Sequence, residues 1–152
     1  MSILHLDLLM WSQKYYLSIG DHCSTYTWMS HLHRPDSSHV LEQLDILQRA
    51  FGRTSKIVTD NGSNLVSEQV NKYCKERNIV HETSSPYSPT SNSRAELGVK
   101  KAKFALRRSK GDFKKAQEIL HRSQAQVKMS DCNSTPLELF LKWRIKYNDI
   151  IS

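Results

Sequence analysis

Long apolar runs are missing from this chain of 152 residues. A membrane-spanning helix needs about 20 predominantly apolar residues, and the most apolar stretch, residues 3–11, is interrupted by His5 and Asp7. The opening has no basic segment followed by an apolar one, so we expect no secretory signal peptide. Cysteine is scarce, with three residues and no CxxC pair. This argues against a disulfide scaffold and favours a reducing compartment.

Acidic residues are also in short supply, because 15 Asp and Glu face 22 Lys and Arg, for a net charge of +7. The excess is local: residues 97–128 hold ten basic and only two acidic residues. A charge run is usually a solvated helix face, but a segment this basic also suits a polyanion such as nucleic acid. The length and a hydrophobic content of 38% predict one domain with a single core.

Hydrophobic periodicity predicts an α/β layer pattern. Leu4, Leu6 and Leu8 alternate with His5 and Asp7 in the first segment, which is typical of a strand. We expect strands at 3–9, 15–19, 23–32, 56–59 and 79–82, with Gly20-Asp21 as a tight turn after the second. We expect helices at 37–51, 67–77, 93–109 and 112–128, a loop at 83–92, and a last helix that begins at Pro136 with Thr135 as its cap.

Three carboxylates stand out against this layout. Asp7 lies inside the first strand, Asp60 ends the fourth, and Glu96 lies at the start of a long helix. A carboxylate in an apolar strand is costly unless a partner compensates its charge, and Mg²⁺ takes oxygen ligands of this kind. Three carboxylates could hold two such ions about 4 Å apart, on the attacking and leaving oxygens of a phosphoryl displacement.

Each carboxylate also has a purely structural interpretation. Asp7 could pair with a lysine at a sheet edge, and Asp60-Asn61-Gly62 is a turn sequence by itself. Ser93-x-x-Glu96 matches a capping box, in which Glu96 would only satisfy a helix N-terminus. The residues taken singly leave both interpretations open.

The order of the motifs resembles the catalytic core of retroviral and gypsy-type retrotransposon integrases, within the ribonuclease H-like DDE recombinases. Thirty-five residues, 61–95, separate Asp60 from Glu96, which is similar to the spacing in that family. The segments that carry the resemblance are LHLD at 4–7, YLSIGDHCS at 16–24, IVTDNGSN at 57–64, SPYSPTSN at 85–92, AE at 95–96 and STPLEL at 134–139.

The resemblance implies a ribonuclease H-like fold, with a five-stranded mixed sheet flanked by helices. It implies that Asp7, Asp60 and Glu96 are the catalytic residues and the ligands of two Mg²⁺ or Mn²⁺ ions. The activity it implies is DNA 3′-end processing and strand transfer, with element ends and target DNA as partners and a homodimer or higher multimer as the assembly. Lys100, Lys103, Tyr87 and Asn92 would contact the DNA. Glu96, Lys100, Lys103 and Arg107 indeed follow helical spacing, so we expect them on one face.

The chain departs from the family in one loop position, where Ser93 replaces a usual glycine. We expect one integrase core domain over 1–152, without a zinc domain before it or a β-barrel after it, no membrane and no small-molecule substrate. The nucleus is the expected location from the function. Two alternatives remain open: a catalytically decayed or host-coopted module that binds DNA or protein, and a nuclease of the ribonuclease H type on the same fold.

Overall fold

The computed structural model describes residues 3–84 and 89–142, with the backbone alone at 89–92. Five strands and four helices are delimited, and residues 136–142 begin a further helix. The elements are β1 (Ile3–Trp11), β2 (Lys14–Asp21), β3 (Thr27–Leu32), α1 (Ser37–Phe51), β4 (Lys56–Thr59), α2 (Glu68–Glu76), β5 (Val80–Thr83), α3 (Pro89–Arg108) and α4 (Phe113–Gln126).

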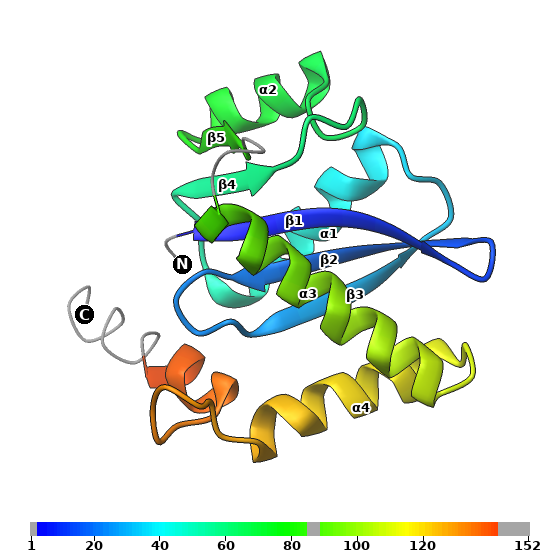
Figure 1. Ribbon diagram of the computed structural model, residues 1–152. Coiled ribbons are helices and arrows are strands. Elements are labelled where there is room, and N and C mark those ends of the chain that lie inside the picture. The colour runs from blue at the N-terminus through cyan, green and yellow to red at the C-terminus, as the bar shows by residue number, and fades with distance from the viewer. Residues whose placement is uncertain (1–2, 85–88, 143–152) are drawn as a thin grey trace.

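The strands form one mixed sheet in the order β3-β2-β1-β4-β5 (Figure 1). β1, β2 and β3 form an antiparallel meander, whereas β4 and β5 run parallel to β1. Each of the two parallel strands is preceded by a helix, α1 before β4 and α2 before β5, as a parallel crossover requires. The predicted five-stranded mixed sheet flanked by helices is therefore confirmed.

The two faces of the sheet have separate apolar cores. Leu4 and Leu6 of β1 join the first core, which includes residues of α1 and α2. Leu9 joins the second, in which β1, β2 and β3 pack against α3 and α4. Because side chains alternate along a strand, Asp7 lies on the same side of β1 as Leu9. The carboxylate therefore faces the layer of α3, which crosses the sheet in Figure 1.

The helix ends are set by local capping residues. Asp36 caps α1 by accepting from the His39 N–H, and the helix stops at Gly52, whose φ of 93° favours glycine. Thr135 accepts from the Glu138 N–H at 3.1 Å, as expected for the cap of the helix that begins at Pro136. Local side chain chemistry is sufficient to place these boundaries.

Three predicted boundaries are wrong, and one of them is the start of the third strand, which is Thr27 and not Cys23. Gly20 and Asp21 are the last residues of β2, and the turn to β3 comes after them, because the Asp21 carboxylate accepts from the backbone N–H and the hydroxyl of Ser24 at 2.9 and 2.7 Å. The long helix begins at Pro89, four residues before the predicted Ser93. Proline suits a first helical turn, and Ser93 consequently lies inside α3.

Gln124 connects α4 to the edge of the sheet through two hydrogen bonds. Its side chain oxygen accepts from the Thr27 N–H at 2.7 Å, and its side chain nitrogen donates to the Thr27 carbonyl at 2.9 Å. Gln124 thus occupies part of the open edge of β3 as a further strand would. Over residues 3–84 and 89–142, no helix is long and apolar enough to cross a bilayer.

Candidate active site

Asp7 is a half-buried carboxylate in the middle of the sheet. Burial, together with the nearby negative charge of Asp60, raises the pKa of Asp7 to about 6 from an ordinary value of 3.8. A hydrogen bond from the Leu8 backbone and the positive charge of Lys103 oppose this rise. The ionised carboxylate is therefore under-compensated by the protein, and a bound cation would supply the missing charge.

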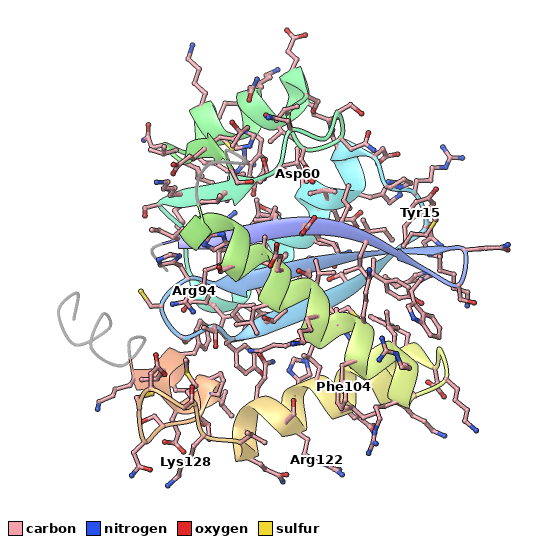
Figure 2. All side chains as sticks on the ribbon, viewed as in Figure 1. Tyr15, Asp60, Arg94, Phe104, Arg122 and Lys128 are labelled. Atoms are coloured by element: carbon pink, nitrogen blue, oxygen red, sulfur yellow. The ribbon has the colours of Figure 1, made fainter. Side chains whose placement is uncertain are left out.

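Asp60 follows the last residue of β4 and is exposed (Figure 2). β1 and β4 pair in parallel with His5 opposite Val58. Asp7 follows His5 by two residues, and Asp60 follows Val58 by two residues. The register therefore places Asp7 and Asp60 side by side. The effect of Asp60 on the Asp7 pKa agrees with this placement.

The turn after Asp60 also confirms part of the structural interpretation of Asp60-Asn61-Gly62. Asp60 Oδ1 accepts from the Gly62 N–H at 2.9 Å, and the Gly62 carbonyl accepts from the N–H groups of Leu65 and Val66. A methyl group at Gly62 would lie 2.9 Å from Asp60 Oδ1, so the Asp60 carboxylate would have to shift. The turn engages one carboxylate oxygen in this bond and so orients the carboxylate.

Glu96 is exposed on α3, about two turns after the helix begins. The interpretation of Glu96 as a capping residue is wrong, since the N-terminus of α3 is at Pro89. A methyl group at Gly98 would lie 3.0 Å from Ser18 Oγ, and Ser18 is the partner of Asp7 in the β1–β2 register. Glycine at 98 thus lets α3 approach the sheet closely beside Asp7.

A groove of about 690 Å³ connects Asp7 with the exposed side of α3. Glu96, Lys100, Lys103 and Arg107 all line it. Their spacing on the continuous helix α3 places these four residues on one helix face, as predicted. Lys103 also contributes to the electrostatics of Asp7. Two carboxylates, those of Asp7 and Glu96, and a row of cations therefore line the same groove.

Asp7 and Glu96 line the same groove, and the strand register places Asp60 beside Asp7. The described residues do not gather all three carboxylates into a closed site. Among the residues that the structure describes, no three His, Cys, Asp or Glu side chains are grouped closely enough to hold a metal ion. The donor set itself fits Mg²⁺ or Mn²⁺, because it consists of carboxylate oxygens only.

The structure describes the side chains of only two of the four predicted DNA contacts. Lys100 and Lys103 are exposed, as a phosphate contact requires. Tyr87 lies outside the described residues, and Asn92 belongs to α3, where its backbone alone is described. Within the described ranges, no carboxylate lies within 4.0 Å of the side chain nitrogens of Lys100, Lys103 or Arg107.

Sequence reasoning missed the half-buried Lys101. Its ammonium donates to the Thr25 carbonyl at 2.8 Å and to the Gln124 side chain oxygen at 3.1 Å. Burial and the charge of Arg94 lower the pKa of Lys101 to about 8. A signal was present in the sequence, since Leu97 and Ala105 lie one turn before and after Lys101 on the same helix face.

His5 was also missed, and no pattern in the sequence indicates its environment. The ring is buried and stacks on His22, with 2.8 Å between His5 Nε2 and His22 Nδ1. Burial and the neighbouring His22 lower the pKa of His5 to about 4. His5 is therefore neutral at physiological pH, and it lies beside the small hollow that Arg94 and Gly98 also line.

Comparison with known proteins places this geometry in a family. The family described as "Integrase core domain" matches residues 1–89. An intracisternal A-particle Pol-related polyprotein of mouse is 27% identical over 130 residues, which cover 86% of this chain and 14% of that protein. An uncharacterized Caenorhabditis elegans protein, K02A2.6, is 33% identical over 110 residues, or 68% of this chain and 9% of that protein. The chain thus spans a small part of these relatives.

Solved structures share the fold over nearly the whole chain. The catalytic core of bovine immunodeficiency virus (BIV) integrase superposes with a TM-score of 0.80 at 18% identity, covering 96% of this chain and 97% of that one. The HTLV-2 integrase core, solved with magnesium as a trimer, gives a TM-score of 0.74 at 17% identity, covering 91% and 95%. A chain of a simian T-cell lymphotropic virus intasome in complex with a PP2A regulatory subunit gives a TM-score of 0.79 at 23% sequence identity. The match covers 91% of this chain and 54% of that one. This chain belongs to the integrase core domain family of retroviruses and retrotransposons, with its ribonuclease H-like fold.

Proposed function

We propose that this chain carries out metal-dependent DNA integration, that is, 3′-end processing followed by strand transfer. The observation that carries the proposal is the adjacency of Asp7 and Asp60 on two neighbouring strands, next to the groove that Glu96 shares with Asp7. The family and the magnesium in the HTLV-2 core support a divalent cation at these residues.

Asp7, Asp60 and Glu96 are the proposed ligands of two Mg²⁺ or Mn²⁺ ions. When bound, such ions activate the attacking water or 3′-hydroxyl and stabilise the leaving oxygen. The contribution of the protein is positional. The β1–β4 register sets the separation of the two aspartates, the bond from the Gly62 N–H orients Asp60, and Gly98 brings α3 with Glu96 close to the sheet.

Lys100 and Lys103 are the proposed contacts to the DNA backbone, with Tyr87 and Asn92 as further contacts near the scissile phosphate. Lysines on one helix face beside a metal site can position phosphates without reading bases. The proposed partners are element ends and target DNA, bound by a multimer of the chain in the nucleus. The proximity of Lys100 and Lys103 to Glu96 in one groove supports this assignment.

The reverse of strand joining on a branched oligonucleotide tests the chemistry, because it requires only phosphoryl transfer at one junction. With Mg²⁺ or Mn²⁺, the parent should resolve the branch into a joined strand and a released end. Asp60→Asn should give no product while remaining folded, and Asp131→Asn, which changes an exposed aspartate elsewhere, should match the parent. Equal rates in the parent and in Asp60→Asn would refute the proposed metal site.

Salt dependence tests the DNA contacts. Replacing Lys100 and Lys103 together by Ala should lower the slope of log affinity against log salt by about two units, since each phosphate contact contributes about 0.9. The matched control replaces Lys72 and Lys75, which are exposed on α2. A slope that does not differ between the two double variants would remove the α3 face from the DNA surface.

A second candidate is a catalytically decayed or host-coopted module that binds DNA or protein. Two observations favour it: the described residues do not form a closed three-carboxylate site, and Ser93 stands inside α3 at the position of the usual glycine. This candidate predicts no product from either the parent or Asp60→Asn, with DNA binding retained. The nuclease alternative predicts cleavage without joining in the same assay.

A further inference from the structure

A second pocket, of about 440 Å³, lies between the N-terminal half of α3 and the end of α4. We call it the basic pocket, after the lining cations Arg94, Lys101 and Lys128. Figure 2 labels Arg94 on α3 and Lys128 beyond the end of α4. Arg94 and Lys128 do not line the groove that holds the candidate active site. Lys101 borders both, but its ammonium donates to Thr25 and Gln124, which line the basic pocket and not the groove.

The cations of the basic pocket lack acidic partners. Within residues 3–84 and 89–142, no carboxylate lies within 4.0 Å of the side chain nitrogens of Arg94, Lys101 or Lys128. Lys128 donates to the neutral side chain of Asn133 at 3.1 Å. Among the described residues of the lining, Asp131 is the one acid, so three cations and one carboxylate leave a formal charge of +2. An anion in the pocket would compensate this charge.

Two of the cations have donors to offer such an anion. The Lys101 ammonium has three N–H groups, and two of them donate to the Thr25 carbonyl and the Gln124 side chain oxygen. The half-buried Arg94 carries a planar guanidinium, which suits two oxygens of one phosphate or carboxylate group. The two charges lie near each other, because the charge of Arg94 helps to lower the pKa of Lys101 to about 8. One oxyanion can therefore face both.

The basic pocket continues inward to a buried atom that lacks a partner. Thr25 and Arg94 also line the small hollow beside His5. His5 is only 5% exposed, and its Nδ1 has no hydrogen-bond partner in the part of the chain that the structure describes. Buried polar atoms are normally hydrogen-bonded. At about 10 Å³, the hollow has room for one water or one polar atom of a ligand. The inner end of the pocket therefore also suits a polar group.

Apolar side chains form much of the remaining lining. They are Leu97 of α3, and Val127, Met129 and Pro136 after α4. The sulfur of a methionine makes favourable contacts with aromatic rings. The volume also falls within the range of about 300–1,000 Å³ that is usual for small-molecule sites. A ligand that satisfies the whole lining has an anionic head and an apolar body.

We propose that the basic pocket binds a small organic phosphate, with its phosphate on Arg94 and Lys101 and its apolar body against Met129. A phosphate monoester carries a charge of about −1.5 to −2 at neutral pH, which matches the formal charge of +2 in the lining. A carboxylate carries only one charge. The inference goes beyond DNA integration and does not depend on it, since none of the three proposed metal ligands lines the basic pocket.

Titration with phenyl phosphate tests the inference, because this compound joins the proposed head to an aromatic body. Calorimetry gives its affinity for the parent, together with the affinities of inorganic phosphate and benzoate, and amide NMR spectra locate the bound compound. The pocket variants are Arg94→Gln and Lys101→Met. The matched control is Arg122→Gln, because Arg122 is exposed on α4 and lines neither the groove nor the basic pocket. Thermal melts verify that each variant is folded.

The parent should bind phenyl phosphate with a Kd below about 1 mM. Inorganic phosphate and benzoate should bind at least about tenfold more weakly, since each lacks one half of the ligand. The amide signals of Leu97 and Val127 should shift on binding, whereas that of Arg107, which lines the groove, should not. Both pocket variants should weaken the binding of phenyl phosphate by about tenfold or more, and Arg122→Gln should match the parent.

No binding of phenyl phosphate to the folded parent would overturn the inference, as would equal losses in Arg94→Gln and Arg122→Gln. Inorganic phosphate or benzoate that binds as tightly as phenyl phosphate would also overturn it. If a DNA duplex displaced phenyl phosphate, and Arg94→Gln weakened the binding of both equally, the basic pocket would be part of a nucleic-acid surface and the inference would be wrong. The metal-dependent reaction is measured separately, so none of these results refutes the proposed function.

Discussion

Replacing Asp7 by Asn removes a charge that the metal-free fold holds at a cost. The pKa of Asp7 is about 6 in the fold, against an ordinary value of 3.8. The native state therefore binds the proton more tightly than the unfolded chain does. Below about pH 4 the carboxyl is protonated in both states and costs nothing, and the penalty develops as the pH rises from about 4 to about 6.

The size of the penalty follows from the shift in pKa. One pKa unit corresponds to about 1.4 kcal/mol, so ionised Asp7 should reduce the free energy of unfolding by about 2–3 kcal/mol above pH 6. Asn has nearly the same shape, and its side chain oxygen can still accept the hydrogen bond from the Leu8 backbone. Asp7→Asn should then raise the melting temperature by about 5–10 °C near pH 8 and leave it unchanged below about pH 4.

Thermal unfolding in the presence of a chelator, followed by circular dichroism across this pH range, measures the effect. Glu42→Gln is the matched control, because Glu42 is exposed on α1 and lies outside the groove. Addition of Mg²⁺ should raise the melting temperature of the parent above that of Asp7→Asn, because the ion stabilises the parent and not the variant. A stability difference that does not change with pH, or a variant less stable than the parent near pH 8, would refute the reasoning.

Three further changes have definite expected results. Gly62→Ala should reduce the stabilisation by Mg²⁺ in thermal melts with little change in the metal-free melting temperature, because the added methyl group displaces the Asp60 carboxylate. Gln124→Ala should lower the free energy of unfolding by about 2–4 kcal/mol in urea titrations, since it leaves two backbone groups of β3 unpaired. Ser93→Gly should lower the melting temperature, because glycine inside a helix costs about 0.5–1 kcal/mol; an unchanged or higher value would contradict the placement of Ser93 within α3.

Much of the fold could be predicted because its signals are local. Alternation in the first strand and the Thr135 cap of the helix that begins at Pro136 act within a few residues, and the structure confirms both. The β2–β3 turn could not be placed in the same way. Gly20-Asp21 is a common turn sequence, but here Asp21 uses its carboxylate to bind Ser24 and so moves the turn beyond itself.

The candidate residues stand out in the sequence, but their geometry does not. The spacing of Asp60 and Glu96 and the helical row from Glu96 to Arg107 are visible in the sequence, and the continuous helix α3 confirms the row. The approach of α3 to the sheet depends on Gly98 and Ser18, which meet only in the folded chain. Long-range hydrogen bonds such as those of Gln124 leave no periodic signal at all.

The central claim is that three carboxylates from three separate elements act as one metal site. Binding of Mn²⁺, followed by calorimetry and by the electron spin resonance signal of the unbound ion, tests it on the parent and on Asp7→Asn, Asp60→Asn and Glu96→Gln. The account predicts that each single variant binds more weakly by at least about tenfold, which is about 1.4 kcal/mol. Parent-like affinity in any one of the three variants would contradict it.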